Sequence, residues 1–249
     1  MAGHSKWAQI KRKKATEDAR RGREFSKLAR ALQVAVREGG PDESKNPHLR
    51  TLLAKAKEIN MPRETIERAI MKGTGELSGE NYEELYYEGY GPGGAALLIE
   101  ILTDNRRRTA SEIRTIMSRG GGSLGESGCV SWIFEKKGVM LVPISAVDED
   151  TLMNIAVEAG ADEVTEEGEY FQITCPPEKL EELKNAFAQK NIQFESAEIS
   201  MTPKTTVEVK GKEALSLLRL VDALEEHEDV QNVYSNFDIP DEVLKEAKA

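Results

Sequence analysis

The spacing of apolar residues predicts three short helices in the first third of the chain. Over residues 17–38 the apolar positions recur every three or four residues, so one stripe of a helix can face a core. Asn46-Pro47 then offers an N-cap and a proline at the first helical position, ahead of a second apolar series over 47–59. A third series runs over 62–72. Together these segments predict a three-helix bundle with one small core.

Beyond residue 79 the pattern changes to short apolar strands that alternate with helices. A continuous apolar run over 95–102 has strand length, and a helix over 107–119 and a strand over 130–134 complete a β-α-β unit. The next segment has the β-α-β-β-α-β order of the ferredoxin-like fold, with strands over 139–144, 163–166, 170–175 and 196–201 and helices over 149–159 and 177–190.

The last part of the chain repeats half of this order, with a strand, a helix and a strand over 205–237. The simplest arrangement pairs this half with the first β-α-β unit. The sequence therefore predicts an α+β protein with an N-terminal three-helix bundle and two ferredoxin-like α/β sandwich domains, one inserted in the other. The predicted domains are 1–77, a discontinuous domain of 78–134 and 204–240, and an inserted domain of 135–203.

Charge is divided unevenly along the 249 residues. Residues 1–72 hold 18 Lys/Arg against 9 Asp/Glu, whereas the rest of the chain holds 16 against 35. An acidic protein that concentrates its positive charge at one end usually presents that end to a polyanion, because phosphate contacts supply most sequence-independent affinity for nucleic acids. The charge division favours a nucleic-acid-facing N-terminal region, and the alternative is a solvated basic surface without a partner.

Three groups of residues are candidates for nucleic-acid binding. The first is a polar, cationic segment ahead of the bundle, in which an aromatic ring could stack on a base or dock on the bundle. The second is the cationic face of the first helix, opposite its apolar stripe. The third is an arginine cluster at a helix start, which could contact RNA or DNA or pair with nearby acids. The candidates are Lys6, Trp7, Lys11, Arg12, Lys13 and Lys14 in the first group, Arg20, Arg23, Lys27 and Arg30 in the second, and Arg106, Arg107 and Arg108 in the third.

The last two predicted helices of the bundle also resemble a helix-turn-helix layout. The helix over 62–72 carries a mixed set of charges, however, and it lacks a cluster of Asn, Gln or Arg at its start that would read base edges. An ordinary three-helix bundle has the same layout.

The sequence contains little evidence for a catalytic site or a cofactor-binding motif. The run Gly120-Gly121-Gly122-Ser123-Leu124-Gly125 matches G-x-G-x-x-G, but it follows a helix and precedes a strand, which is the wrong context for a dinucleotide. We expect a flexible connection there, or backbone N–H groups that meet a phosphate. The three histidines lie in three different segments, and neither cysteine has a histidine nearby in sequence. The sequence therefore offers no catalytic pair of a nucleophile and a general base. We expect no enzyme activity, no cofactor and no small-molecule substrate.

The remaining composition points to a cytoplasmic protein. No apolar stretch approaches the roughly 18 residues that span a bilayer, and no membrane partner is expected. Cys129 and Cys175 are far apart in sequence, which favours two thiols over a disulfide or a metal site. Acidic runs such as 225–229 lack the ligand spacing of a calcium loop and are interpreted as solvated charge.

Several motifs spread over nearly the whole chain resemble the YebC family. They are Ala2-Gly3-His4-Ser5-Lys6-Trp7, Gly39-Gly40-Pro41-Asp42 with Asn46-Pro47, Asn60-Met61-Pro62, Tyr87-Glu88-Gly89-Tyr90-Gly91-Pro92, Thr103-Asp104-Asn105 with Arg108-Thr109, and Gly121-Gly122 before Gly128. Arg107 departs from the family pattern, which usually has Asn before the Arg-Thr pair.

The resemblance implies a helical domain followed by two α/β domains, and it implies no enzymatic activity. It points to two functions: a DNA-binding transcriptional regulator, or a ribosome-bound translation factor that contacts ribosomal RNA and helps difficult sequences such as proline runs through synthesis. A basic arm and an acidic body suit recognition of structured RNA by shape and phosphate contact. Both functions stay open at the level of sequence.

Overall fold

The computed structural model describes residues 17–240, with side chains from residue 21 onward. Its first part is a bundle of three helices, α2 (Glu17–Gly39), α3 (Pro47–Glu58) and α4 (Arg63–Thr74). Leu32, Leu49 and Ala56 are fully buried at its centre. The predicted three-helix bundle is confirmed, since each amphipathic segment buries its apolar stripe against the other two.

Asn46 fixes the turn between α2 and α3. Its side-chain oxygen accepts a hydrogen bond from the backbone N–H of Leu49 at 3.0 Å, which confirms the predicted N-cap. Its amide nitrogen donates to the carbonyl oxygens of Ala35 and Gly40 at 2.8 and 2.9 Å. A Cβ on Gly39 would lie 2.6 Å from that nitrogen, so the close approach needs glycine.

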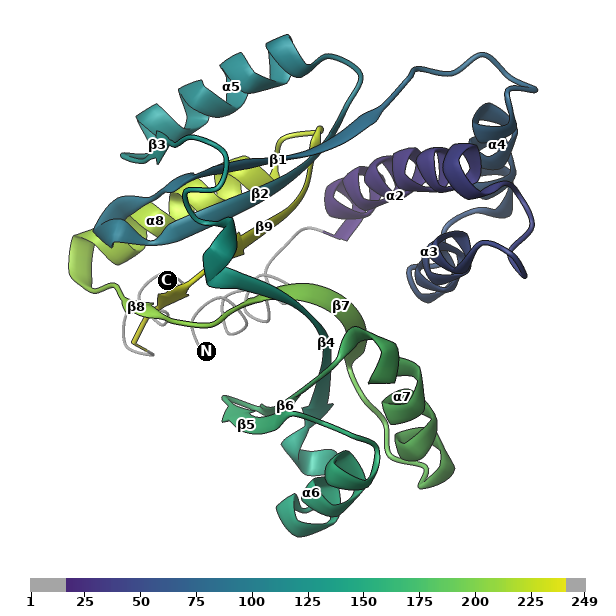
Figure 1. The fold of residues 1–249 in the computed structure, drawn as a ribbon, viewed down its shortest axis with the longest axis vertical. Coiled ribbons are helices and arrows are strands. Elements are labelled where there is room, and N and C mark those ends of the chain that lie inside the picture. Colours follow the sequence, from purple (N-terminus) through teal and green to yellow (C-terminus); the bar gives the residue numbers. More distant parts are fainter. Residues whose placement is uncertain (1–16, 241–249) are drawn as a thin grey trace.

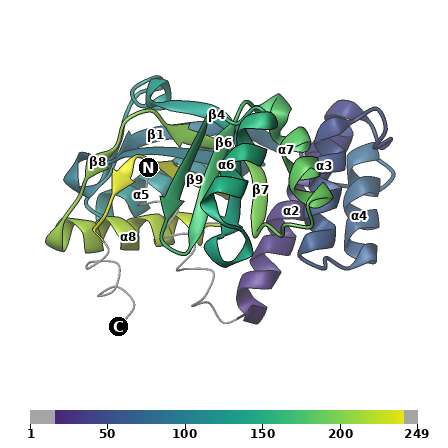
Figure 2. The ribbon, with the colours of Figure 1, turned by 90° about the horizontal axis from the view of Figure 1, so that it is seen from below.

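The second part is a four-stranded sheet with the strand order β3-β1-β2-β9 and two helices on one face (Figure 1). The elements are β1 (Glu83–Tyr90), β2 (Ala96–Thr103), α5 (Arg106–Arg119), β3 (Ser123–Leu124), α8 (Gly211–Glu225) and β9 (Val230–Ser235). Leu97, Ile99 and Ile101 of β2 face the two helices and are fully buried with Ile113 and Val221. In Figure 2, helix α8 runs along this part and the helical bundle lies at the opposite end of the molecule.

The third part has the predicted β-α-β-β-α-β order and the strand order β5-β6-β4-β7. Its elements are β4 (Phe134–Pro143), α6 (Glu149–Glu158), β5 (Glu163–Glu167), β6 (Tyr170–Cys175), α7 (Leu180–Gln189) and β7 (Ser196–Pro203). All its neighbouring strands are antiparallel, and Met140, Ile173 and Phe187 lie in its buried core. This arrangement confirms the ferredoxin-like fold.

The two sheets meet where the chain enters and leaves the third part. Phe134 pairs with Pro203, so the first residue of β4 lies beside the last residue of β7. A small core of Ala96, Leu98 and Val130 packs there against Phe134. Nearby, β8 (Val207–Glu208) pairs in parallel with β10 (Phe237–Asp238). This pairing fits the insertion of 135–203 between 78–134 and 204–240, and we keep those boundaries as a proposal.

Two local predictions are wrong. The segment 130–134 is not a strand, because Ser131–Ile133 forms a short 3-10 turn, η2, before β4 begins. The glycine run is not a plain flexible connection, because Ser123 and Leu124 form the edge strand β3 against β1. A Cβ on Gly122 would lie 2.8 Å from the carbonyl oxygen of Tyr90, so the run contains glycine where two backbones come close.

Candidate nucleic-acid interface

The structure places only part of the predicted basic surface. Lys6, Trp7, Lys11, Arg12, Lys13 and Lys14 lie outside the described residues, and Arg20 belongs to α2 without a described side chain. Arg23 is exposed near the start of α2. The roles of these residues therefore stay predictions.

Lys27 and Arg30 do not lie on a solvated outer face, contrary to the expectation for the cationic side of α2. Lys27 donates a hydrogen bond to the carbonyl oxygen of Glu225, in the last turn of α8, at 2.8 Å. Cations are stabilised at this position because the carbonyl groups of a helix end carry partial negative charge. Arg30 is 20% exposed and pairs with Glu228 at 3.0 Å and with Asp229 at 3.1 Å.

The same face of α2 makes further polar contacts with the segment that leads into β1. Gln33 donates to the carbonyl oxygen of Glu80 at 2.7 Å, and Arg37 donates to Asn81 and to the carbonyl oxygen of Tyr82. The guanidinium of Arg30 also lies 5.6 Å from the centre of the Tyr82 ring. The cationic side of α2 thus holds the helical bundle against the sheet part.

Asp229 is the centre of this junction, at the start of β9. Its side chain is 6% exposed, so the interpretation of residues 225–229 as solvated charge is wrong for this residue. It accepts hydrogen bonds from Arg108 at 2.9 Å, Thr109 at 2.7 Å and Thr103 at 3.2 Å, besides the bond from Arg30. Burial raises the pKa of Asp229, but the hydrogen bonds from Arg108, Thr109 and Thr103 and the charge of Arg108 together outweigh burial and hold the pKa below its usual value.

Arg108 is accordingly a structural residue at the start of α5. It bonds Asp104 at 2.8 Å in addition to Asp229, and these two hydrogen bonds raise its pKa. Asn105 caps the helix by accepting a hydrogen bond from the backbone N–H of Arg108 at 3.1 Å. Ion pairing with nearby acids was the alternative that the sequence left open for this residue.

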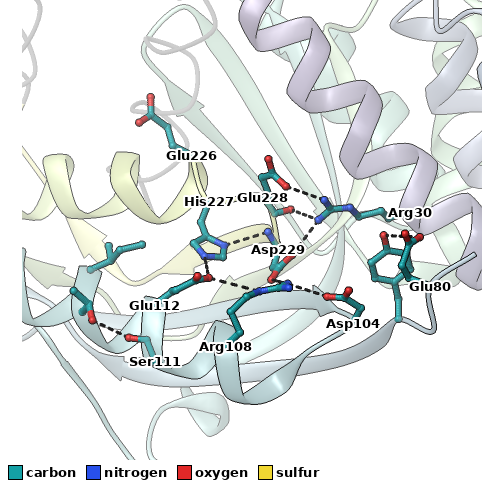
Figure 3. A pocket seen from close by; sticks show the side chains of 13 residues that line it. Arg30, Glu80, Asp104, Arg108, Ser111, Glu112, Glu226, His227, Glu228 and Asp229 are labelled. Carbon is teal, nitrogen blue, oxygen red and sulfur yellow. Dashed lines mark hydrogen bonds and ion pairs between the residues drawn. The ribbon is translucent and has the colours of Figure 1, made fainter.

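A cleft of about 780 Å³ opens between α2, α5 and the turn after α8 (Figure 3). Arg30, Arg108 and Asp229 line it together with Glu112 and His227. His227 lies 2.9 Å from Glu112 through Nε2, and its Nδ1 accepts from the backbone N–H of Asp229 at 3.1 Å. No local pattern in the sequence indicates this cleft, because its lining residues come from four segments that are distant along the chain.

Glu112, His227 and Asp229 are also a possible set of metal ligands by distance, since one donor atom of each lies within 4.8 Å of the others. Each carboxylate oxygen of Asp229 already bonds a guanidinium, however. Both imidazole nitrogens of His227 have partners as well. The cluster satisfies itself by hydrogen bonds, and we assign no metal to it.

The outer face of α5 borders the cleft, whose lining includes Ser111. Arg107, Ser111, Arg114 and Ser118 follow one another at helical spacing and are all exposed. We call these four residues the α5 stripe. Within residues 21–240, neither arginine of the stripe forms an ion pair. Arg106 is 66% exposed and lies 3.8 Å from Glu83, so it contributes a weak surface pair beside the stripe.

Comparison with known proteins identifies the family. The model of the TACO1/YebC protein N-terminal domain matches residues 5–76, and the model of the TACO1/YebC second and third domain matches residues 82–237. The chain belongs to the TACO1/YebC family. The resemblance found in the sequence motifs is thereby confirmed, together with an architecture of a helical domain and two further domains.

Full-length relatives of this family carry a regulatory name. A "probable transcriptional regulatory protein" of Pelotomaculum thermopropionicum is 55% identical, over 97% of this chain and all of its own length. A protein of the same description from Halothermothrix orenii is 54% identical over 99% of this chain and 98% of its own length. The crystal structure of a conserved hypothetical protein of Aquifex aeolicus is 48% identical, covers 91% of this chain and 94% of its own, and superposes with a TM-score of 0.82.

Proposed function

We propose that this member of the TACO1/YebC family is a non-enzymatic, nucleic-acid-binding regulator of gene expression that acts in the cytoplasm. Its relatives named probable transcriptional regulatory proteins support a regulatory role, with DNA as the first candidate target. The observation that carries the proposal is the separation of charge, with a basic first 72 residues on an acidic chain of net charge −10. No helix within the described residues is long and apolar enough to cross a membrane.

The described residues offer two places for phosphate contact. Arg23 is exposed on α2, before the part of that helix that docks on the sheet. The α5 stripe presents two arginines spaced by serines, whose hydroxyl groups also donate to phosphate oxygens. A stripe with two arginines and no acid, on a part of the chain that is otherwise strongly acidic, supports a contact with a polyanion.

Lys27 and Arg30 are less available for nucleic-acid contact than the sequence predicted. Because both already bond the end of α8 and the turn after it, a phosphate must compete with Glu228 and Asp229 for Arg30. We therefore assign the nucleic-acid contact of α2 chiefly to the residues before Lys27 and to the basic arm, defined as Lys11, Arg12, Lys13 and Lys14.

The alternative function is a ribosome-associated translation factor that contacts ribosomal RNA. The charges of α4 favour this alternative, because Arg63 pairs with Glu67 at 2.7 Å and Arg68 pairs with Glu64 at 3.3 Å on its exposed face. A helix whose arginines are paired with its own acids is poorly suited to reading base edges in a major groove. Contact with phosphates and RNA shape needs no such recognition helix.

One experiment distinguishes the two candidate functions. Co-sedimentation with ribosomes from a lysate is measured over a salt series, beside a titration of random duplex DNA at the same ionic strengths. Ribosome binding that resists salt, with weak DNA binding, supports the translation factor. DNA binding that survives near-physiological salt without ribosome association supports the transcriptional regulator, and the absence of both refutes the proposal.

A further inference from the structure

Trp132 is the largest exposed apolar side chain among the described residues. It is 67% exposed, in the η2 turn that precedes β4. Tryptophan is usually largely buried in folded proteins, so the exposed indole of Trp132 is a large apolar surface that is available for a contact outside the chain.

The orientation of the Trp132 ring is set by a hydrogen bond. Its Nε1 donates to the carbonyl oxygen of Cys129 at 3.1 Å, and the hydroxyl of Tyr90 donates to the same oxygen at 3.1 Å. Tyr90 is itself 40% exposed. Two aromatic side chains from different elements therefore converge on one backbone oxygen with their polar groups satisfied, and both stay partly exposed.

The loop that carries Cys129 is held by a buried carboxylate. Glu88 is 6% exposed, and it accepts from the backbone N–H groups of Gly128 at 2.7 Å and of Val130 and Ser131 at 2.8 Å. Burial raises the pKa of Glu88, but these three hydrogen bonds outweigh burial and keep the pKa below its usual value. An ionised anchor on the central strand β1 fixes the turn, so the rings are ordered before any partner binds.

The charge around the two rings is mixed. The backbone N–H of Lys204 donates to the carbonyl oxygen of Ile133 at 2.8 Å, which places an exposed lysine beside the η2 turn. Glu126 is exposed on the same loop. With the buried, ionised Glu88 behind the same loop, one cation stands against two acids and the local charge gives no net attraction for phosphates, so the rings themselves must supply the binding energy at this place.

We propose that Tyr90 and Trp132 form a stacking surface for an unpaired base of a single-stranded nucleic acid. This inference rests on the proposed function and adds to it a second contact, distinct from the cationic surfaces. Aromatic rings bind bases of any sequence, because every base has a flat π face. A base within an intact duplex has both faces covered by its neighbours, so the surface selects loops, ends or single strands.

The test uses the full chain with Trp7→Phe, so that Trp132 is the single tryptophan that reports on binding. The probe is a short oligothymidylate, compared with an abasic oligomer of the same length and charge. Stacking is expected to quench the fluorescence of Trp132 with the first probe and not with the second. Trp132→Ala is expected to weaken binding of the oligothymidylate by on the order of 10-fold.

The salt dependence of the affinity distinguishes a loss of stacking from a loss of charge. Because Trp132→Ala removes no cation, the slope of log affinity against log salt is expected to stay unchanged. Val157→Ala is the matched control, since Val157 is 66% exposed on α6 and its loss should leave the affinity unchanged.

The stacking surface is overturned if the oligothymidylate does not quench Trp132 and binds Trp132→Ala as tightly as the protein that keeps Trp132. The salt-dependent binding of the proposed function would still stand. In that case the exposed ring of Trp132 would be interpreted as a contact for a protein partner. If neither oligomer nor duplex binds the protein at any salt concentration, the stacking surface and the DNA-binding function both fail.

Discussion

Replacing Asp229 by Ala should destabilise the protein substantially, because Asp229 joins α2, α5 and β9. The substitution removes a carboxylate that is 6% exposed and that accepts from Arg30, Arg108, Thr103 and Thr109. Removing one partner of a buried ion pair costs about 3–5 kcal/mol, since the other charge and the buried donors lose their partners.

The lower end of that range applies here. Arg30 keeps Glu228, and Arg108 keeps Asp104, so neither guanidinium is left without an acid. We expect a loss of about 3 kcal/mol, which corresponds to a melting temperature lower by roughly 6–12 °C in a protein of this size. The measurement is urea unfolding followed by circular dichroism, with thermal unfolding as a second probe.

Glu228→Ala is the matched control, because Glu228 pairs with the same arginine but is 80% exposed. An exposed ion pair contributes about 0–1 kcal/mol, so this variant should unfold close to the unchanged protein. Equal, small losses of stability in the two variants would show that Asp229 does not hold this junction together.

The pH dependence of this contribution has a defined sign. The pKa of Asp229 in the folded protein is lower than its usual value, which is about 3.9 in the unfolded chain. The contribution is therefore fully present above pH ~3.9 and is lost as the pH falls through the folded pKa. The stability difference between the unchanged protein and Asp229→Ala should shrink only in that acidic range.

Three further outcomes are expected. Replacing the four residues of the basic arm by Ala should weaken nucleic-acid binding similarly for all sequences and lower the salt slope, and an unchanged affinity in gel-shift titrations would contradict the role of the arm. Arg107→Ala with Arg114→Ala should lower the slope by about 2, whereas Arg68→Ala, which removes an arginine paired with Glu64, should change it less. Residues 135–203 expressed alone should unfold cooperatively by circular dichroism, and a disordered product would refute the insertion.

The helices were predictable because their signals are local. The apolar stripes of α2, α3 and α4, the N-cap at Asn46 and the cap at Asn105 are each contained within a few consecutive residues. The inserted part was predictable for the same reason, since the order of its elements already matches a known fold. The uneven distribution of charge also needs no structure.

Strand β1 and the turn at Ser131–Ile133 were not predictable in this way. The segment of β1 has one aliphatic residue, Leu85, among Glu, Tyr and Gly, and its Glu88 becomes buried only because the loop at 128–131 supplies three N–H donors. Apolar residues at 130–134 indicated a strand, but they serve as the small core between the two sheets. Burial of this kind depends on a partner that is distant in sequence.

The helical bundle, the ferredoxin-like insert and the concentration of positive charge in the first third of the chain all follow from local patterns of residues. Which of those cations remain available to a partner depends instead on how the parts pack together. Lys27 and Arg30 have the same helical spacing as an exposed basic face, yet the end of α8 and Asp229 lie against them. Such contacts depend on the distance between two groups in space, and the residues in contact here are nearly 200 positions apart in the chain.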